Sequence, residues 1–292
     1  MHMIQDIAPK KFHVEYKNIQ PQLDDTVFVF LGSSKPQDRA LVKQENGHRI
    51  IPTLRELQAA GYAQDSEQLQ FLFAIDDKNY FLLNNGGTES VQLPGYETIT
   101  IREFWNCAPE LVDEIAFAAQ TAYHLFFWYR DNTCCGRCGA RMKSWDKERA
   151  VRCPSCGNLV FPKLMPAVII GLKHGDHLLI SRYAGRAYKG IALLAGFCEV
   201  GETMEETVAR EIQEEVGLSC KNITYFGSQP WGVDSNLLAG FFADLDGEAD
   251  ITLDHEELAK ATWVNRADIP VQENCSSLTM TMIEAFRQGK IK

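Results

Sequence analysis

The stretch that most constrains this chain is GFCEVGETMEETVAREIQEEVGL, residues 196–218, which holds seven glutamates and one arginine. If the stretch forms a helix, Glu211, Glu214 and Glu215 fall at positions i, i+3 and i+4 and project from one face. Three carboxylates so close together lose stability unless a cation sits among them, and Mg²⁺ or Mn²⁺ suits such hard oxygen ligands. A solvated acidic helix face is the alternative, but the spacing favours a metal site.

Other residues of the stretch predict how the acidic helix is supported. Arg210 and Glu202 carry opposite charges and are expected to pair, which would tie the preceding loop to the helix. Gly196 would let the loop backbone approach closely, and Gly217 can end the helix in the left-handed conformation. These residues are therefore expected to be structural.

A second cluster consists of cysteines. Cys135 and Cys138 form one CxxC pair, and Cys153 and Cys156 form a second after fourteen intervening residues. Each CxxC turn can direct two thiolates at one ion, and two such turns complete the tetrahedral shell that zinc prefers. Four thiolates leave no open position for water, so the zinc is expected to be structural. Cys134 leaves the register open, because with Cys138 it would form CxxxC; the Cys135 register is preferred.

The predicted ribbon is basic in an acidic chain. Residues 133–163 hold seven Lys or Arg against two acids, a local charge of +5 in a chain of formal net charge −10. Such a patch could meet an RNA backbone, the phosphates of a small substrate or an acidic partner domain. A structural role remains the preferred interpretation of the ribbon. The basic residues are Arg137, Arg141, Lys143, Lys147, Arg149, Arg152 and Lys163.

The overall composition is that of a globular protein, with 45% hydrophobic and 23% charged residues and length enough for two domains. The net negative charge argues against a protein that coats nucleic acid or anionic membranes through its overall field. No apolar run approaches a membrane span, and the N-terminus lacks the apolar core of a signal peptide. The odd count of nine cysteines argues against a disulfide framework. A cytoplasmic protein is expected.

Three regions follow from the pattern. Residues 1–130 show short β-like runs followed by a helix over 109–131. The aromatic end of this helix is interpreted as part of a helix buried between domains rather than as a stacking platform. Residues 131–163 form the ribbon. In residues 164–292 strands and helices alternate irregularly, which favours a mixed sheet covered by helices. The predicted fold class is α/β, or α+β, with a smaller α/β N-terminal domain.

The acidic stretch reads G-x5-E-x7-R-E-U-x-E-E-x-G-U, with Ile212 and Leu218 at the apolar positions U. In this it resembles the Nudix box of the Nudix hydrolases at every fixed position. The resemblance implies an α/β/α sandwich with a mixed sheet, and hydrolysis of a nucleoside diphosphate linked to another group. It also implies that three box glutamates and a backbone carbonyl at Ala195 bind the catalytic cation, with a later glutamate, Glu257, as a further ligand or base. Glu256 is the alternative, and so is a solvated surface role for either.

The regions around the box narrow the resemblance to the NADH pyrophosphatase branch of that family. A four-cysteine ribbon precedes the box, and Ser228-Gln229-Pro230-Trp231 follows it. The branch usually continues as SQPWPFPxS, whereas here Gly232, Val233 and Asp234 replace Pro-Phe-Pro, which leaves the dinucleotide preference open. The branch also implies a homodimer.

Further substrate contacts are implied by the same resemblance. Phe161 and Phe197 match aromatic residues that stack on nicotinamide, with core packing as the alternative for each. Arg102 also resembles a contact position, on a weak alignment. The implied substrate contacts are Phe161, Phe197, Gln229, Pro230, Trp231, Ser235 and Glu148.

The resemblance thus predicts an enzyme that cleaves NAD(H) to nicotinamide mononucleotide, or its reduced form, and AMP, and that can remove NAD caps from RNA. One alternative is a Nudix diphosphatase for ADP-ribose or dinucleoside polyphosphates. Another is an inactive nucleotide sensor that uses the ribbon to bind nucleic acid. The intact box argues against the sensor, because only hydrolysis requires the metal cluster.

Overall fold

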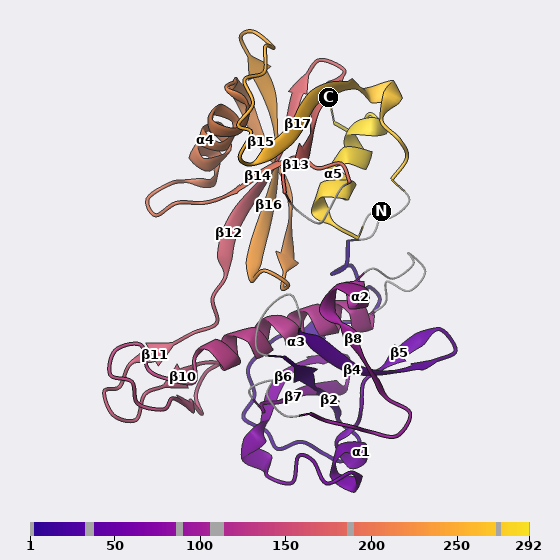
Figure 1. Ribbon diagram of the computed structural model, residues 1–292, viewed down its shortest axis with the longest axis vertical. Coiled ribbons are helices and arrows are strands. Elements are labelled where there is room, and N and C mark those ends of the chain that lie inside the picture. Colours follow the sequence, from indigo (N-terminus) through magenta and orange to yellow (C-terminus); the bar gives the residue numbers. More distant parts are fainter. Residues whose placement is uncertain are drawn as a thin grey trace. The chain divides into compact units, whose positions relative to one another are not determined.

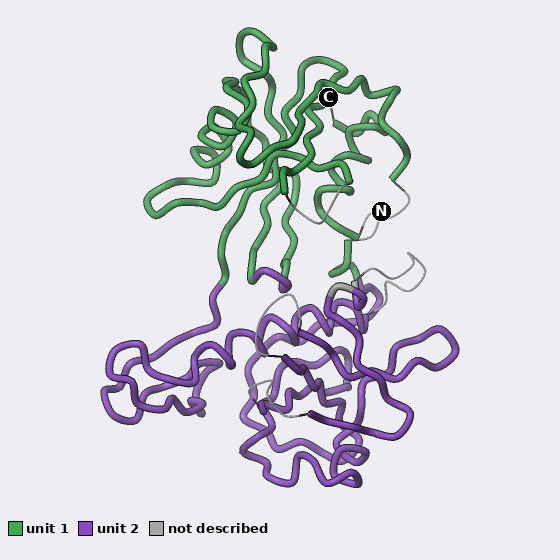
Figure 2. The backbone as a smooth tube through the Cα atoms, viewed as in Figure 1, with its two compact units in different colours: residues 1–6, 164–231, 235–292 green, residues 7–163, 232–234 purple. Residues whose placement is uncertain are grey.

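A computed structural model describes residues 3–32, 38–85, 90–105, 114–185, 190–272 and 276–291, without the side chains of residues 102 and 105. The chain divides into two compact units (Figure 2). The C-terminal unit comprises Met1–Asp6, Leu164–Trp231 and Ser235–Lys292. The N-terminal unit comprises Ile7–Lys163 and Gly232–Asp234.

The C-terminal unit is built on one mixed sheet (Figure 1). Its strands run in the order β15-β16-β12-β13-β17, and β14 pairs with β12. The β12–β16 pair is parallel, whereas the other pairs are antiparallel. The elements are β12 (Met165–His174), β13 (His177–Tyr183), β14 (Leu194–Phe197), α4 (Met204–Val216), β15 (Ser219–Trp231), β16 (Asn236–Asp246), β17 (Leu258–Asn265), the 3₁₀ turn Arg266–Asp268 and α5 (Leu278–Arg287).

Both faces of this sheet are covered, which explains why β12 is apolar without alternation. On one face Val168 and Ile170 pack with the buried side of α4, including Ile212. On the other face Ile169 packs with α5, including Met282. The mixed sheet between helices confirms the expected α/β/α sandwich.

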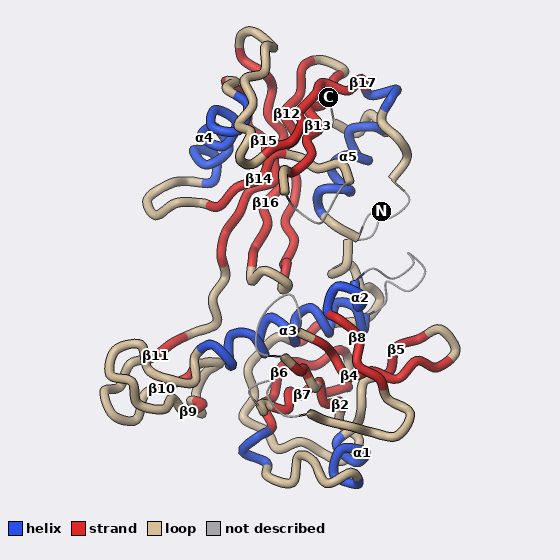
Figure 3. Tube along the Cα trace, viewed as in Figure 1, coloured by secondary structure: helices blue, strands red, loops and turns tan. Residues whose placement is uncertain are grey.

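The N-terminal unit carries smaller sheets in a mixed α+β arrangement. One sheet has the order β1-β6-β7-β2, a second has β3-β4-β5 with β8 beside β4, and the third is the ribbon, β11-β10-β9. Secondary structure is coloured in Figure 3. The elements are β1 (Phe12–His13), β2 (Thr26–Phe28), β3 (Phe30–Leu31), β4 (Arg39–Glu45), β5 (His48–Ile50), α1 (Leu54–Ala59), the 3₁₀ turn Ser66–Gln68, β6 (Leu69–Ile75), β7 (Lys78–Leu83), β8 (Glu97–Thr100), α2 (Ile101–Trp105), α3 (Glu114–Asp131), β9 (Lys143–Ser144), β10 (Val151–Arg152) and β11 (Leu159–Val160).

Helix α3 is the centre of this unit. It covers the C-terminal part of the predicted helix, and residues 109–113 lie outside the described ranges. Its aromatic end is buried, with Phe126 at 0% and Trp128 at 3% exposure, so the interpretation as a buried helix is confirmed over a stacking platform. The same hydrophobic core includes ribbon residues such as Cys153 and Met142. The ribbon therefore shares its core with the N-terminal domain.

None of the described helices is both long and apolar enough to cross a membrane.

Candidate active site

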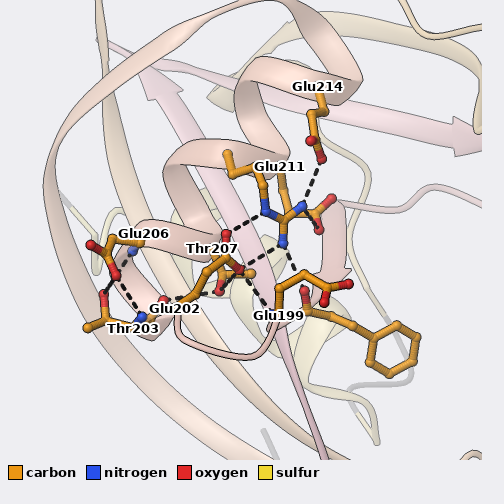
Figure 4. Close-up of polar contacts among 9 residues, drawn as sticks. Glu199, Glu202, Thr203, Glu206, Thr207, Glu211 and Glu214 are labelled. Carbon is orange, nitrogen blue, oxygen red and sulfur yellow. Dashed lines mark hydrogen bonds and ion pairs between the residues drawn. The ribbon is translucent and has the colours of Figure 1, made fainter.

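Both ends of helix α4 are capped by residues next to it in the chain, Thr203 at the start and Gly217 at the end. The Thr203 hydroxyl accepts a hydrogen bond from the Glu206 N–H (3.2 Å), and the Glu206 carboxylate accepts one from the Thr203 N–H (2.8 Å), a capping box that Figure 4 shows. At the other end Gly217 has φ 68° and its N–H donates to the Gln213 carbonyl. The left-handed ending expected at Gly217 is confirmed.

The acidic face of α4 lies against strand β14. Glu211 is 8% exposed and Glu215 is 2% exposed, whereas the Glu214 side chain is 58% exposed. The Ala195 N–H donates to Oε1 of Glu215 over 3.3 Å. The helix therefore presents two buried carboxylates to this strand and a third to solvent.

Gly196 makes this close approach possible. A Cβ atom at this position would lie 1.9 Å from both Cδ and Oε1 of Glu211. No side chain can therefore replace the hydrogen of Gly196 without moving the Glu211 carboxylate. The expected close approach of the backbone at this glycine is what the structure shows.

Arg210 connects the loop to the acidic face, and its acidic partners Glu202, Glu211 and Glu214 are labelled in Figure 4. Its Nε and Nη2 donate to the two oxygens of Glu202 at 2.6 and 3.0 Å, which confirms the expected ion pair. Its Nη1 donates to Glu211 and Glu214, each at 2.7 Å. Its Nη2 also donates to the Phe197 carbonyl at 2.9 Å. One guanidinium thus bridges three carboxylates, offsets only part of their charge, and fixes the loop end of β14.

The surroundings of Glu202 and Glu211 change the pKa values of these two carboxyl groups in opposite directions. The hydrogen bonds from Arg210, followed by that from the Glu199 N–H, lower the pKa of Glu202 to about 2. Burial raises the pKa of Glu211; the charge of Arg210 opposes this rise, and the negative charges of Glu214 and Glu257 add to it. Glu211 therefore lies in a cluster with an excess of negative charge.

The next feature is the pair of glutamates before β17, Glu256 and Glu257, one of which is predicted to bind the cation or act as a base. Glu257 is exposed, and its charge acts on Glu211 within the same unit. The Glu256 N–H instead donates to the Asp254 side chain (2.8 Å) in the turn before β17. The charge of Glu257 thus adds to the negative charge around Glu211, and its role as a cation ligand stays a prediction.

The donor set suits a hard divalent cation. It consists of carboxylate oxygens, it includes a buried acid whose ionisation is opposed by burial and like charges, and it faces a backbone cradle that a Cβ at Gly196 would fill. Arg210 offsets part of the charge of Glu211 and Glu214 through its two ion pairs.

The second metal centre is the cysteine cluster. The four Sγ atoms of Cys135, Cys138, Cys153 and Cys156 lie within 4.8 Å of one another, as one tetrahedral zinc site requires. Cys134 is exposed, and an isolated β-bridge pairs its backbone with Arg141 instead. The Cys135 register is therefore confirmed.

Each half of the cluster is a turn with the same internal hydrogen bonds. The N–H of Gly139 donates to the Cys135 carbonyl, and that of Gly157 donates to the Cys153 carbonyl. Both glycines have positive φ, 74° and 75°, as the sequence predicts for these turns. The Arg137 N–H donates to the Cys135 sulfur and lowers the pKa of that thiol to about 6, which favours the thiolate.

Several predicted substrate contacts are available to solvent. Phe161 is 48% exposed and Phe197 is 51% exposed, so neither packs in a core. Glu148 and Pro230 are also exposed, and Trp231 is partly exposed. Phe197 lies next to the metal cradle, since it ends β14 and its carbonyl binds Arg210. The side chain of Arg102 lies outside the described part of the chain.

Gln229, which is predicted to bind substrate, is buried in this structure. It is 0% exposed, its amide donates to Gln5 Oε1 and to the Ser276 carbonyl, and its Oε1 accepts from the Leu278 N–H at the start of α5. The amide thus ties the N-terminal segment and α5 to β15. Ser235 is likewise buried, at 4% exposure. In this structure these two side chains support the fold.

Some supporting residues were missed in the sequence. The Thr207 hydroxyl donates to Glu202 (2.9 Å), and the Glu199 N–H donates to the same carboxylate (3.0 Å). The capping box at Thr203 was readable from its T-x-x-E spacing. No local signal, however, indicates that Gln5 joins the distant C-terminal unit.

An α/β/α sandwich that presents clustered carboxylates beside a glycine cradle defines a class of proteins suited to divalent cations and phosphate groups. A family model described as "NUDIX domain" matches residues 163–280, and one described as "NADH pyrophosphatase zinc ribbon domain" matches residues 130–161. The chain therefore belongs to the Nudix hydrolase family, in the branch that carries the NADH pyrophosphatase zinc ribbon.

Relatives from bacteria agree with this. The chain is 34% identical over 201 residues to an NAD-capped RNA hydrolase NudC of Pseudomonas aeruginosa, covering 68% of this chain and 70% of that protein. It is 32% identical over 246 residues to the NAD-capped RNA hydrolase NudC of Photobacterium profundum, covering 75% of this chain and 92% of that one. A solved Nudix hydrolase of Nitrosomonas europaea aligns with a TM-score of 0.45 and 19% identity over 54% of this chain and 92% of that one.

Proposed function

We propose that this protein hydrolyses the pyrophosphate bond of NAD(H), giving nicotinamide mononucleotide or its reduced form and AMP, and that it removes NAD caps from RNA by the same reaction. The observation that carries the proposal is the Arg210-linked acidic face of α4 against the Gly196 cradle. The zinc ribbon and the names of the relatives support the choice of substrate.

In this proposal the carboxylates of Glu211, Glu214, Glu215 and Glu257 and the carbonyl of Ala195 would hold the catalytic cation. When bound, a divalent cation neutralises pyrophosphate charge and makes water a stronger nucleophile. Gly196 keeps the Glu211 carboxylate close to β14, and Glu202 holds Arg210, so both act by positioning. Phe197, which ends β14, offers an exposed aromatic surface on which a nicotinamide ring can stack, and the family resemblance implies such a role for Phe161 as well.

A panel of substrates tests this proposal. NADH, NAD⁺, ADP-ribose, diadenosine polyphosphates and a 5′-NAD-capped RNA are each incubated with Mg²⁺ or Mn²⁺, and the products are separated by chromatography. Preferential release of AMP from NAD(H), and of 5′-monophosphate RNA from the capped RNA, is expected. Faster turnover of ADP-ribose or polyphosphates would contradict it and point to another Nudix diphosphatase activity.

Three finer statements belong to the same proposal and rest on the family resemblance. The catalytic cation is Mg²⁺ or Mn²⁺, the protein is a homodimer, and it acts in the cytoplasm. Activity titrations with each metal test the first, the molar mass by light scattering tests the second, and fractionation of the source cells tests the third.

A further inference from the structure

The ribbon sheet has two faces of opposite character. In its antiparallel register Val151 lies opposite Ser144 and Val160, and residues that lie opposite one another share a face. Val151 is 5% exposed in the core of the N-terminal unit, as is Met142 at 8%. The Ser144 hydroxyl donates to the Gln70 side chain of β6 over 2.8 Å. This face is therefore fully used by the fold.

The other face carries three cations. Lys143 and Arg152 lie directly opposite each other, and Arg141 precedes Lys143 by two residues, which puts it on the same side. All three are exposed, and none forms a side-chain hydrogen bond or ion pair within the described part of the chain. Like charges directly opposite on neighbouring strands are destabilising. The fold thus tolerates a repulsion that it does not compensate.

A comparison within the ribbon shows that its cations are not all alike. The Arg149 guanidinium donates to the carbonyls of Val14, Phe71 and Leu72, so this cation fastens the ribbon to the N-terminal domain. The two acids of the ribbon, Asp146 and Glu148, lie in the loop beside Arg149 rather than on the strands. The strand cations are therefore left for a partner outside the fold.

We propose that Arg141, Lys143 and Arg152, here called the ribbon basic face, bind the sugar-phosphate backbone of single-stranded RNA that follows an NAD cap. The inference rests on the proposed function for its substrate class. Contacts from such cations to phosphate oxygens provide affinity without sequence preference. Charge complementarity favours this occupant, because the chain as a whole is acidic and would repel RNA elsewhere.

The test compares two substrates and two triple variants. One variant is Arg141→Gln, Lys143→Gln and Arg152→Gln; the control, Lys11→Gln, Lys17→Gln and Lys290→Gln, makes the same charge change at exposed lysines elsewhere. On NAD-capped single-stranded RNA, the first variant should lose about tenfold in kcat/KM at low salt. Its salt slope should weaken by about 2, at roughly 0.7 per lost phosphate contact. Hydrolysis of free NAD⁺ should stay unchanged in both variants, and the control should behave as wild type on both substrates.

Other outcomes overturn the inference. An equal loss of kcat/KM on free NAD⁺ would show that the ribbon basic face binds the phosphates of the small substrate instead. Unchanged kcat/KM and salt slope on capped RNA would show that this face does not bind RNA. Zinc content and melting temperature verify that the variants fold. A double variant that keeps the charge, Arg141→Lys with Arg152→Lys, should retain the wild-type salt slope. If wild type cleaves neither substrate, the proposed function fails. Fluorescence anisotropy with an uncapped 5′-phosphorylated oligoribonucleotide then still decides whether the face binds RNA.

Discussion

The acidic face of α4 and the cysteine cluster of the ribbon are two metal-binding regions built on opposite plans. In the ribbon, Cys135 and Cys153 are buried in a hydrophobic core, and all four sulfurs already lie within 4.8 Å of one another. Within the described part of the chain, no group of carboxylates is as tightly clustered as these four sulfurs. On α4, Arg210 holds two of the carboxylates by ion pairs, and one of these, Glu214, is open to solvent.

The two regions differ in a way that suits one to a permanently bound metal and the other to an exchangeable one. Closed thiolate geometry within a core makes zinc part of the folding free energy. A carboxylate cluster with one guanidinium keeps an excess of negative charge, which an exchangeable divalent cation can balance. Removing a ligand should therefore damage activity in one region and stability in the other.

The largest expected effect is on activity, from Glu214→Gln. Loss of one ligand charge should lower kcat by about 10³-fold, since metal charge stabilisation is worth several kcal/mol. The melting temperature should hardly change, because this side chain is 58% exposed. Steady-state kinetics and thermal melting check both statements. Glu205→Gln, an exposed acid on the same helix, is the matched control, and equal loss in both variants would argue against a specific site.

The next effect comes from Gly196→Ala. The added methyl group would lie 1.9 Å from the Glu211 carboxylate and displace it, which should lower kcat/KM by about 10²-fold. Gly227→Ala, where a Cβ meets nothing within 4 Å, should retain activity. Kinetics at saturating Mg²⁺ or Mn²⁺ measure the difference. Wild-type activity in Gly196→Ala would show that the Glu211 position is unimportant.

In the ribbon, Cys138→Ser should act on stability. Loss of a zinc ligand is expected to destabilise the N-terminal unit by about 3 kcal/mol or more, because the zinc site shares its core. Cys134→Ser alters an exposed neighbour outside the cluster and should leave zinc content and melting unchanged. Calorimetry with zinc analysis measures this. An unchanged melting profile after zinc loss would break the comparison.

The smallest effect is pH-dependent and involves Glu202. Its pKa falls from 4.5 to about 2 on folding, so its ionised form stabilises the protein above pH 4.5, and that contribution disappears as the pH falls toward 2. The difference in unfolding free energy between wild type and Glu202→Gln should therefore narrow across this window. Denaturant titrations at several pH values measure it. A constant difference would show that the Arg210 pair does not carry this linkage.

Both regions are predictable from the sequence, because each depends on the spacing of residues that are close together in the chain. Helical periodicity places Glu211 and Glu215 on one face, and CxxC turns fix which thiols converge, because these relations involve residues that are neighbours in the chain. The left-handed ending at Gly217 and the Arg210–Glu202 pair were predictable for the same reason. The surroundings of Gln229 are not predictable in this way, because its motif does not reveal that its amide is enclosed by Gln5 and α5.

Short-range periodicity and ligand chemistry predict the acidic helix, the zinc register and the mixed sheet. Tertiary packing sets how closely Glu211 approaches β14, what encloses Gln229, and which ribbon cations fasten the domain while others stay exposed. These outcomes depend on packing between segments far apart in the chain, where a difference of a single Cβ or one strand register reverses the result.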